Sequence, residues 1–107
     1  MRQTLLLICV LVARQEVCIS DHGYDELSED DIRVSDILAG VTDAVMVEDC
    51  SEYYKGPCVL VLQRDHQGHP IHVVWGVPRH ATSPAVVGTT YRPNIEQWTD
   101  DFLRRKS

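Results

Sequence analysis

The stretch CVLVLQRDHQGHPIHVVWGV, residues 58–77, decides the fold. Two apolar runs flank a polar segment that contains glycine, and this pattern is typical of two strands joined by a tight turn. The stretch therefore predicts a β-hairpin. If Gln67 and Gly68 form a two-residue turn, Gln63 lies opposite His72.

This register sorts the hairpin side chains between the two faces of the sheet, because successive side chains of a strand point to opposite sides. The bulkier face is expected to pack under helices: Leu60, Leu62, Ile71, Val73 and Trp75. The thinner face is expected to stay less covered: Val59, Val61, Gln63, His72, Val74 and Gly76. His72 then lies beside Gln63, on the face where we expect a ligand.

Along the chain, helices are expected before and after an antiparallel meander of strands. Ser20 is a good N-cap residue, and Ile95, Trp98 and Phe102 have the spacing of an amphipathic helix. The expected helices are 4–13, 21–31, 35–40 and 94–106, and the expected strands are 43–49, 58–65, 70–77 and 84–92. The sequence thus predicts one α+β domain over residues 1–107, with N-terminal helices on a four-stranded antiparallel sheet and a C-terminal helix.

The first segment, MRQTLLLICVLVA, has two interpretations. Its basic start and apolar run are close to a short secretory signal, but the RQEV that follows lacks a small-x-small cleavage pattern. We favour a buried first helix that packs on Leu60, Leu62 and Trp75. Since a bilayer span needs ~20 residues, the run is too short to cross a membrane, and we expect no membrane partner.

Charge and cysteine content narrow the class of protein. The formal net charge is −6, whereas proteins that grip a phosphate backbone non-specifically usually carry excess lysine and arginine. The four cysteines show neither a C-x-x-C pair nor zinc-finger spacing: Cys9, Cys18, Cys50 and Cys58. We expect all four to be reduced and mostly structural, which fits a cytoplasmic protein.

Three segments, ISDHGYDELSEDDIRVSDILAGV, GPCVLVLQRDHQGHPIHVVWGV and TTYRPNIEQW, carry a family resemblance from about Ser20 to Trp98. Its markers are a histidine that opens an early helix, a histidine in a central strand, and a Thr-x-Tyr-x-Pro segment before a tryptophan: His22, His72, Thr89, Tyr91, Pro93 and Trp98. In these features the chain resembles bacterial domain of unknown function 4258, a group placed near the RelE/ParE-like toxins and the wider barnase–EndoU–colicin–RelE ribonuclease-like fold. The resemblance implies a RelE-like architecture.

The resemblance also implies a function, a toxin-type ribonuclease whose partners are RNA and a cognate antitoxin protein. One departure counts against it. Typical members carry arginines in the helix after the first histidine, at positions held here by Glu26 and Asp30. Arginines there would be natural phosphate ligands. The two acids and the net charge favour an alternative, a non-catalytic interaction module on the same fold.

Metal-free RNA cleavage needs a base for the 2′-hydroxyl proton, an acid for the leaving oxygen and a cation for the charged transition state. Histidine titrates near neutrality and fills either of the first two roles, so His22 and His72 are the expected catalytic pair. In the alternative, His22 caps its helix and His72 is hydrogen-bonded to Gln63. The expected substrate-binding residues are Gln63, Arg64, Tyr91 and Arg92, with Lys55 as a further cation.

Three evenly spaced histidines, His66, His69 and His72, invite a zinc interpretation. In the expected hairpin His66 and His69 face each other across the turn, but no third ligand converges with them, as zinc requires. We therefore expect no metal and no cofactor. No oligomeric state is predicted.

Overall fold

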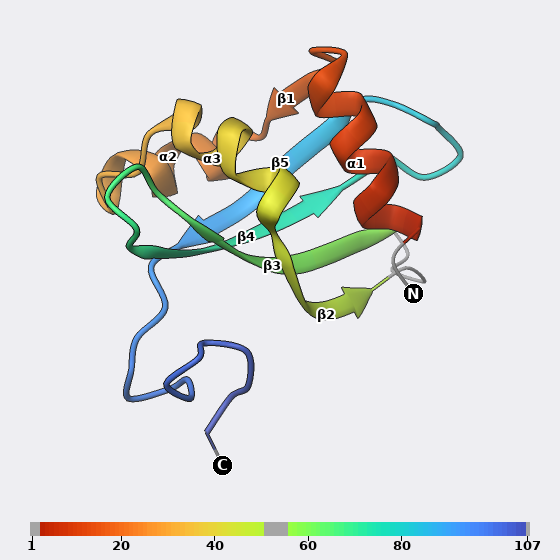
Figure 1. Cartoon of the computed structure of the whole chain (residues 1–107). Coiled ribbons are helices and arrows are strands. Elements are labelled where there is room, and N and C mark those ends of the chain that lie inside the picture. The colour runs from red at the N-terminus through yellow and green to blue at the C-terminus, as the bar shows by residue number, and fades with distance from the viewer. Residues whose placement is uncertain (1–2, 51–55, 107) are drawn as a thin grey trace.

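One five-stranded sheet carries helices on one face and the C-terminal segment on the other (Figure 1). The computed structural model describes residues 3–50 and 56–106. The helices are α1 (Gln3–Ala13), α2 (Asp21–Glu29) and α3 (Val34–Gly40), followed by the 3-10 turn η1 (Val41–Asp43). The strands are β1 (Val17–Ile19), β2 (Val45–Cys50), β3 (Cys58–Arg64), β4 (Pro70–Gly76) and β5 (Ala85–Tyr91).

The sheet is mixed, so the prediction of a four-stranded antiparallel sheet is wrong. Its strand order is β1-β5-β4-β3-β2, and β1 runs parallel to β5 while the other neighbours are antiparallel. A run of three residues between two helices is too short to show strand alternation. β1 forms because its backbone pairs with Ala85–Val87, a partner far along the chain.

The hairpin register differs by one residue from the expected one, because Leu62 and not Gln63 lies opposite His72. The side chains of β4 are divided between the faces as predicted, whereas those of β3 are reversed. The helix-covered face holds Val59, Val61, Gln63, Ile71, Val73 and Trp75. The opposite face, called the rear face below, holds Leu60, Leu62, Arg64, His72, Val74 and Gly76.

Asp65 causes this shift by holding a turn that is one residue longer. Its Oδ1 accepts hydrogen bonds from the backbone N–H groups of Gln67 and His69, both at 2.9 Å. The resulting loop has three residues, 66–68, and Gly68 takes the left-handed φ of +83° that such loops use. Apolar alternation contains no signal for a side-chain cap of this kind.

The core lies between the helices and the sheet. Leu5, Ile8 and Leu11 of α1 are buried in it, and α1 contacts β3, β4 and β5. The prediction of a buried first helix is confirmed. The sheet face that this helix covers holds Trp75, as predicted, but it holds Val59 and Val61 of β3 in place of Leu60 and Leu62. None of the described helices is long and apolar enough to cross a bilayer.

The helix α2 is fixed closely on β5. The expected N-cap is confirmed, since the Ser20 Oγ accepts from the N–H of Gly23 at 3.0 Å and also donates to the carbonyl of Gly88 at 3.1 Å. A Cβ on Gly23 would lie 2.9 Å from the carbonyl oxygen of Val87, so only glycine allows this approach. This close approach holds α2 against β5.

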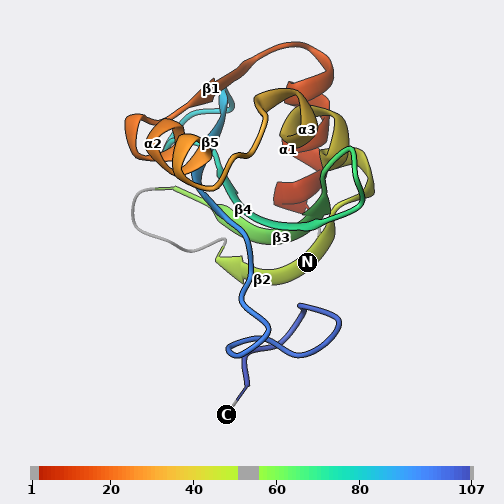
Figure 2. The same cartoon turned by 90° about the vertical axis from the view of Figure 1, so that its left-hand side faces the viewer.

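The predicted C-terminal helix is wrong, because residues 93–106 form turns. Asn94 Oδ1 accepts from the N–H of Glu96 at 2.8 Å, and Asp101 Oδ1 accepts from the N–H of Leu103 at 3.0 Å. Such local bonds compete with helix formation for the same backbone groups. Figure 2 shows this segment on the side of the sheet away from the helices, and we call it the C-terminal strap.

Candidate functional site around His72

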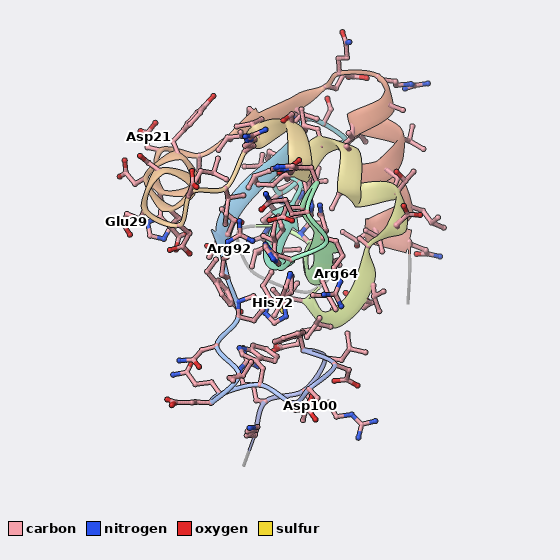
Figure 3. The ribbon with its side chains drawn as sticks, turned by 60° about the vertical axis from the view of Figure 1, so that its left-hand side comes forward. Asp21, Glu29, Arg64, His72, Arg92 and Asp100 are labelled. Carbon is pink, nitrogen blue, oxygen red and sulfur yellow. The ribbon has the colours of Figure 1, made fainter. Side chains whose placement is uncertain are left out.

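His72 lies in the central strand on the rear face and is fully buried (Figure 3). Its Nε2 is 2.8 Å from the carbonyl oxygen of Phe102, and since a carbonyl only accepts, Nε2 carries the ring proton. Its Nδ1 then accepts from the Tyr91 hydroxyl at 3.1 Å. The Trp98 ring packs edge-on at 4.3 Å between centroids. The neutral imidazole thus uses both of its nitrogens.

Burial keeps this pair of side chains uncharged. It lowers the pKa of His72 below its ordinary value, and the hydrogen bond to the Phe102 carbonyl opposes this shift only in part. Burial likewise raises the pKa of Tyr91. A general acid or base needs a pKa near the working pH and access to the reacting proton. Here His72 has no access to solvent while the strap is in place.

Gln63 lies in the core, on the face opposite to His72. Its Nε2 donates to the carbonyl of Ile37 at 2.9 Å, and its Oε1 accepts from the indole N–H of Trp75 at 2.8 Å. These bonds join α3 to β3 and β4. The prediction that Gln63 lies beside His72 is wrong, because of the one-residue shift in register.

The guanidinium group of Arg92 contacts residues from several loops. Its Nη1 lies 3.0 Å from Asp65 Oδ2, and other guanidinium N–H groups lie 3.4–3.5 Å from the carbonyl oxygens of Asp30, Asp31 and Pro70. Burial would raise the pKa of the Asp65 carboxyl, but two backbone N–H groups of the turn and the guanidinium hold that pKa below its ordinary value. Arg92 therefore neutralises a buried carboxylate and joins the turn to the α2–α3 connection.

Glu26 of α2 and Asp30, the residue that follows α2, supply acceptors to the edge of β5. Because β1 pairs with β5 only as far as Val87, the N–H groups further along that edge have no strand beside them. Glu26 Oε1 accepts from the N–H of Thr90 at 3.0 Å, and Asp30 Oδ2 accepts from the N–H of Arg92 at 3.2 Å. The acids that stand where the family resemblance implies arginines thus have a structural role.

His22 and His72 are not brought together. The side chain of His22 is 70% exposed, and its Nε2 lies 3.4 Å from Glu26 Oε1 in the same helix. In Figure 3, Asp21 and Glu29 mark the two ends of α2, well away from His72, which lies between the sheet and the strap. This geometry gives no support to a cleft shared by the two imidazoles, and the catalytic role of each stays a prediction.

Arg64 is the most accessible of the predicted substrate-binding side chains. Its Nη1 lies 3.4 Å from the carbonyl of Gly68 in its own hairpin. It lines a hollow of about 250 Å³ together with Asp43 and Leu62. A carboxylate in the same hollow opposes phosphate binding there. Lys55, the further predicted cation, lies outside the described residues.

The turn histidines pair with carboxylates instead of converging. His66 Nδ1 lies 2.8 Å from Asp36 Oδ2, and His69 Nδ1 lies 3.7 Å from Asp65 Oδ2. Over residues 3–50 and 56–106, no three His, Cys, Asp or Glu side chains are grouped as metal ligands. Asp36 was missed by sequence reasoning because it lies 30 positions from His66, beyond any local pattern.

Two further groups at the site have no sequence signal. The Phe102 carbonyl is a backbone atom, so its residue type does not mark it. Glu48 of β2 forms an ion pair with Arg105 of the strap, 57 positions away, and the Arg105 guanidinium lies 4.9 Å from the centroid of the Trp98 ring. The site is therefore built from β2, β4, β5 and the strap together.

One family model covers more than half of the 107 residues. It is described as Domain of unknown function (DUF4258) and matches residues 19–92. No curated protein and no solved structure matches the chain. Glu48, His72 and Tyr91 fall within the matched residues, whereas the strap falls outside them. The chain therefore belongs to the DUF4258 family of domains of unknown function.

Proposed function

We propose that this chain is a non-catalytic protein-interaction module with a RelE-like architecture, a cytoplasmic relative of the RelE/ParE-like toxins. The three marker segments resemble domain of unknown function 4258, a group placed near those toxins, and this supports the architecture. Its four cysteines are free, which fits a reducing compartment. The competing function is a toxin-type, metal-independent ribonuclease with an antitoxin as partner.

The observation that carries the proposal is that the fold itself uses the groups a nuclease would need. His72 is buried with both ring nitrogens bonded, and Gln63 is bonded on the other side of the sheet. Arg92 is paired with a buried carboxylate. A phosphate entering here would have to break these contacts before it gained any of its own.

Charge supports the same conclusion. The helix that carries His22 is acidic along its length, from Asp21 to Glu29, and Asp30 and Asp31 follow it. With a net charge of −6, the chain lacks the long-range attraction that brings RNA to a basic surface. A protein partner needs no such attraction.

The test compares RNA cleavage by the wild-type chain with cleavage by His72→Gln and His22→Gln, at low salt where any attraction for RNA is strongest. His22→Gln is the matched control for folding, because that side chain is 70% exposed. We expect all three proteins to leave RNA intact and none to arrest growth on expression.

The nuclease would be established by the opposite result. General acid–base assistance contributes ~10²–10⁴-fold to rate, so a catalytic His72 should lose that much activity as glutamine while the protein stays folded. The wild-type rate should then also depend on pH below ~6.5, the ordinary histidine pKa, because burial lowers the pKa of His72. Either finding would overturn the interaction module.

A further inference from the structure

The C-terminal strap is attached to the rear face at two points. At the first, His72 Nε2 donates to the Phe102 carbonyl at 2.8 Å and the Trp98 ring packs on the imidazole. At the second, Arg105 pairs with Glu48 of β2. Trp98 is only 4% exposed, so its indole is the buried anchor of the strap. The strap thus contacts the sheet through side chains and one carbonyl.

The backbone hydrogen bonds of the strap are internal. The N–H of Thr99 donates to the carbonyl of Arg104 and the N–H of Lys106 donates to the carbonyl of Gln97, both at 2.9 Å. The strap adds no strand to the described sheet. It can therefore leave as a unit, since its own bonds and the ladder of the sheet both stay intact.

Phe102 is held in an uncommon backbone conformation while the strap is docked. Its φ is +62°, a left-handed value that large side chains rarely adopt. Strained residues of this kind persist where surrounding contacts hold them, and they gather at sites that switch. The carbonyl of this same residue receives the His72 N–H. Undocking would break this bond.

Between the two contacts, the rear face carries an apolar row with a charge at one end. His72 lies on β4 and Glu48 on β2, and β3 runs between them with Leu60 and Leu62 on the same face. Both leucines are 7% exposed in the docked state. All four residues belong to the part of the chain that matches the family, whereas the strap does not.

The rear face continues beyond the strap into an open hollow. Val74 follows His72 on this face of β4, and Thr89 follows Tyr91 on β5. Both line a mostly apolar hollow of about 560 Å³ that reaches Gly76. A segment seated at His72 can therefore extend into space that the strap leaves empty.

We propose that the rear face around His72 is a docking site for a segment of another protein, and that the strap occupies it as an intramolecular substitute. The partner segment places an aromatic ring on the imidazole and a cation beside Glu48, as Trp98 and Arg105 do. The inference rests on the proposed function as an interaction module, and it specifies the surface and the chemistry of the partner.

The probe is a fluorescent synthetic peptide of residues 93–107, PNIEQWTDDFLRRKS, titrated into the full-length protein. Trp98→Ala removes the anchor of the strap, whereas Ile95→Ala changes a strap residue that is 65% exposed. We expect Trp98→Ala to bind the peptide at least about tenfold more tightly than wild type, because the strap no longer competes for the face. Ile95→Ala should bind like wild type.

A charge exchange tests the second contact. Glu48→Arg in the Trp98→Ala protein should lose the peptide, and a peptide with Arg105→Glu should regain binding to it. If Trp98→Ala fails to fold, Arg105→Glu in the full-length protein serves as the second opening variant.

The outcomes separate the two proposals. Equal affinity of wild type and Trp98→Ala, or no rescue by the exchanged charges, would overturn the docking site and leave the proposed function standing. A wild-type dimer that dissociates on Trp98→Ala would assign the face to a second copy and overturn an external partner. RNA cleavage that starts when Trp98→Ala frees His72 would overturn the non-catalytic function.

Discussion

Gln63→Glu tests whether Gln63 belongs to the core or to a ligand site. The substitution keeps the shape of the side chain and the acceptor for the Trp75 indole, but it replaces the donor to the Ile37 carbonyl with a second oxygen. In the core this places an unpaired carboxylate where the residue is 2% exposed. At a solvated ligand site the same change would have little effect on stability, within about 0.5 kcal/mol.

The magnitude follows from the pKa of the new carboxyl. Full burial raises a glutamate pKa by up to ~3–5 units, and each unit corresponds to ~1.4 kcal/mol. With a rise of about 3 units above ~4.3, the variant should be destabilised by about 3–4 kcal/mol at pH 7 and by about 1 kcal/mol at pH 5. The cost grows with pH because the folded state must lose a proton that it holds more tightly than the unfolded state.

The assay is urea unfolding of wild type and Gln63→Glu at pH 5, 6 and 7, with the difference taken at each pH. Gln67→Glu is the matched control, because Gln67 is exposed in the turn next to the same strand. We expect the control to stay within about 0.5 kcal/mol of wild type. A Gln63→Glu difference that is small and the same at every pH would refute the register and the core position of Gln63.

Three further predictions concern buried polar groups. Thr90 Oγ1 is buried and has no hydrogen-bond partner within residues 3–50 and 56–106. Thr90→Val should therefore raise the free energy of unfolding by about 1 kcal/mol, and a loss of stability in urea would reveal a partner. Burial lowers the pKa of His72, so below about pH 6.5 the unfolded chain binds more protons than the folded chain. Wild type should therefore lose stability as the pH falls through this range, and His72→Gln should lose less. An equal loss in both proteins would show that His72 is solvated. Burial, and then the neighbouring Cys50, raises the pKa of the Cys58 thiol to about 11, so maleimide at pH 8 should label Cys58 more slowly than exposed Cys18; equal rates would contradict its burial.

Local signals predicted the elements that local forces decide. Ser20 caps α2, Gly40 ends α3, and the apolar runs of β3 and β4 form a hairpin, as expected. A helix cap and an apolar period act over a few residues, so the sequence displays them directly. The α+β class followed from these elements.

Two of the errors, the hairpin register and the terminal helix, share one cause, which is that a polar side chain outside the apolar pattern decided the outcome. Asp65 caps its own turn and moves β3 by one residue, which reverses every β3 side chain between the faces. Asn94 and Asp101 bond to their own backbone and replace the terminal helix with turns. Apolar periodicity does not detect any of these three side chains.

The candidate site was harder to predict than the fold. His72 and Tyr91 were both predicted site residues, but the hydrogen bond between them was not predicted. Glu48 and the Phe102 carbonyl join them only through contacts between distant parts of the chain. Contacts between residues this far apart in the sequence form only in the folded topology, and no local sequence pattern marks them.

Glu26 and Asp30 make the two edges of the sheet unequal toward other chains. On one side, Glu26 and Asp30 occupy the N–H groups of β5 that a foreign strand would need. On the other side, the outer edge of β2 pairs with no strand of the described residues, and Val45 there is 47% exposed. An unpaired edge is the usual template for aggregation and for strand addition. The other edge strand, β1, has only three residues, so growth of this sheet beyond one molecule, as fibril or as complex, is directed to β2.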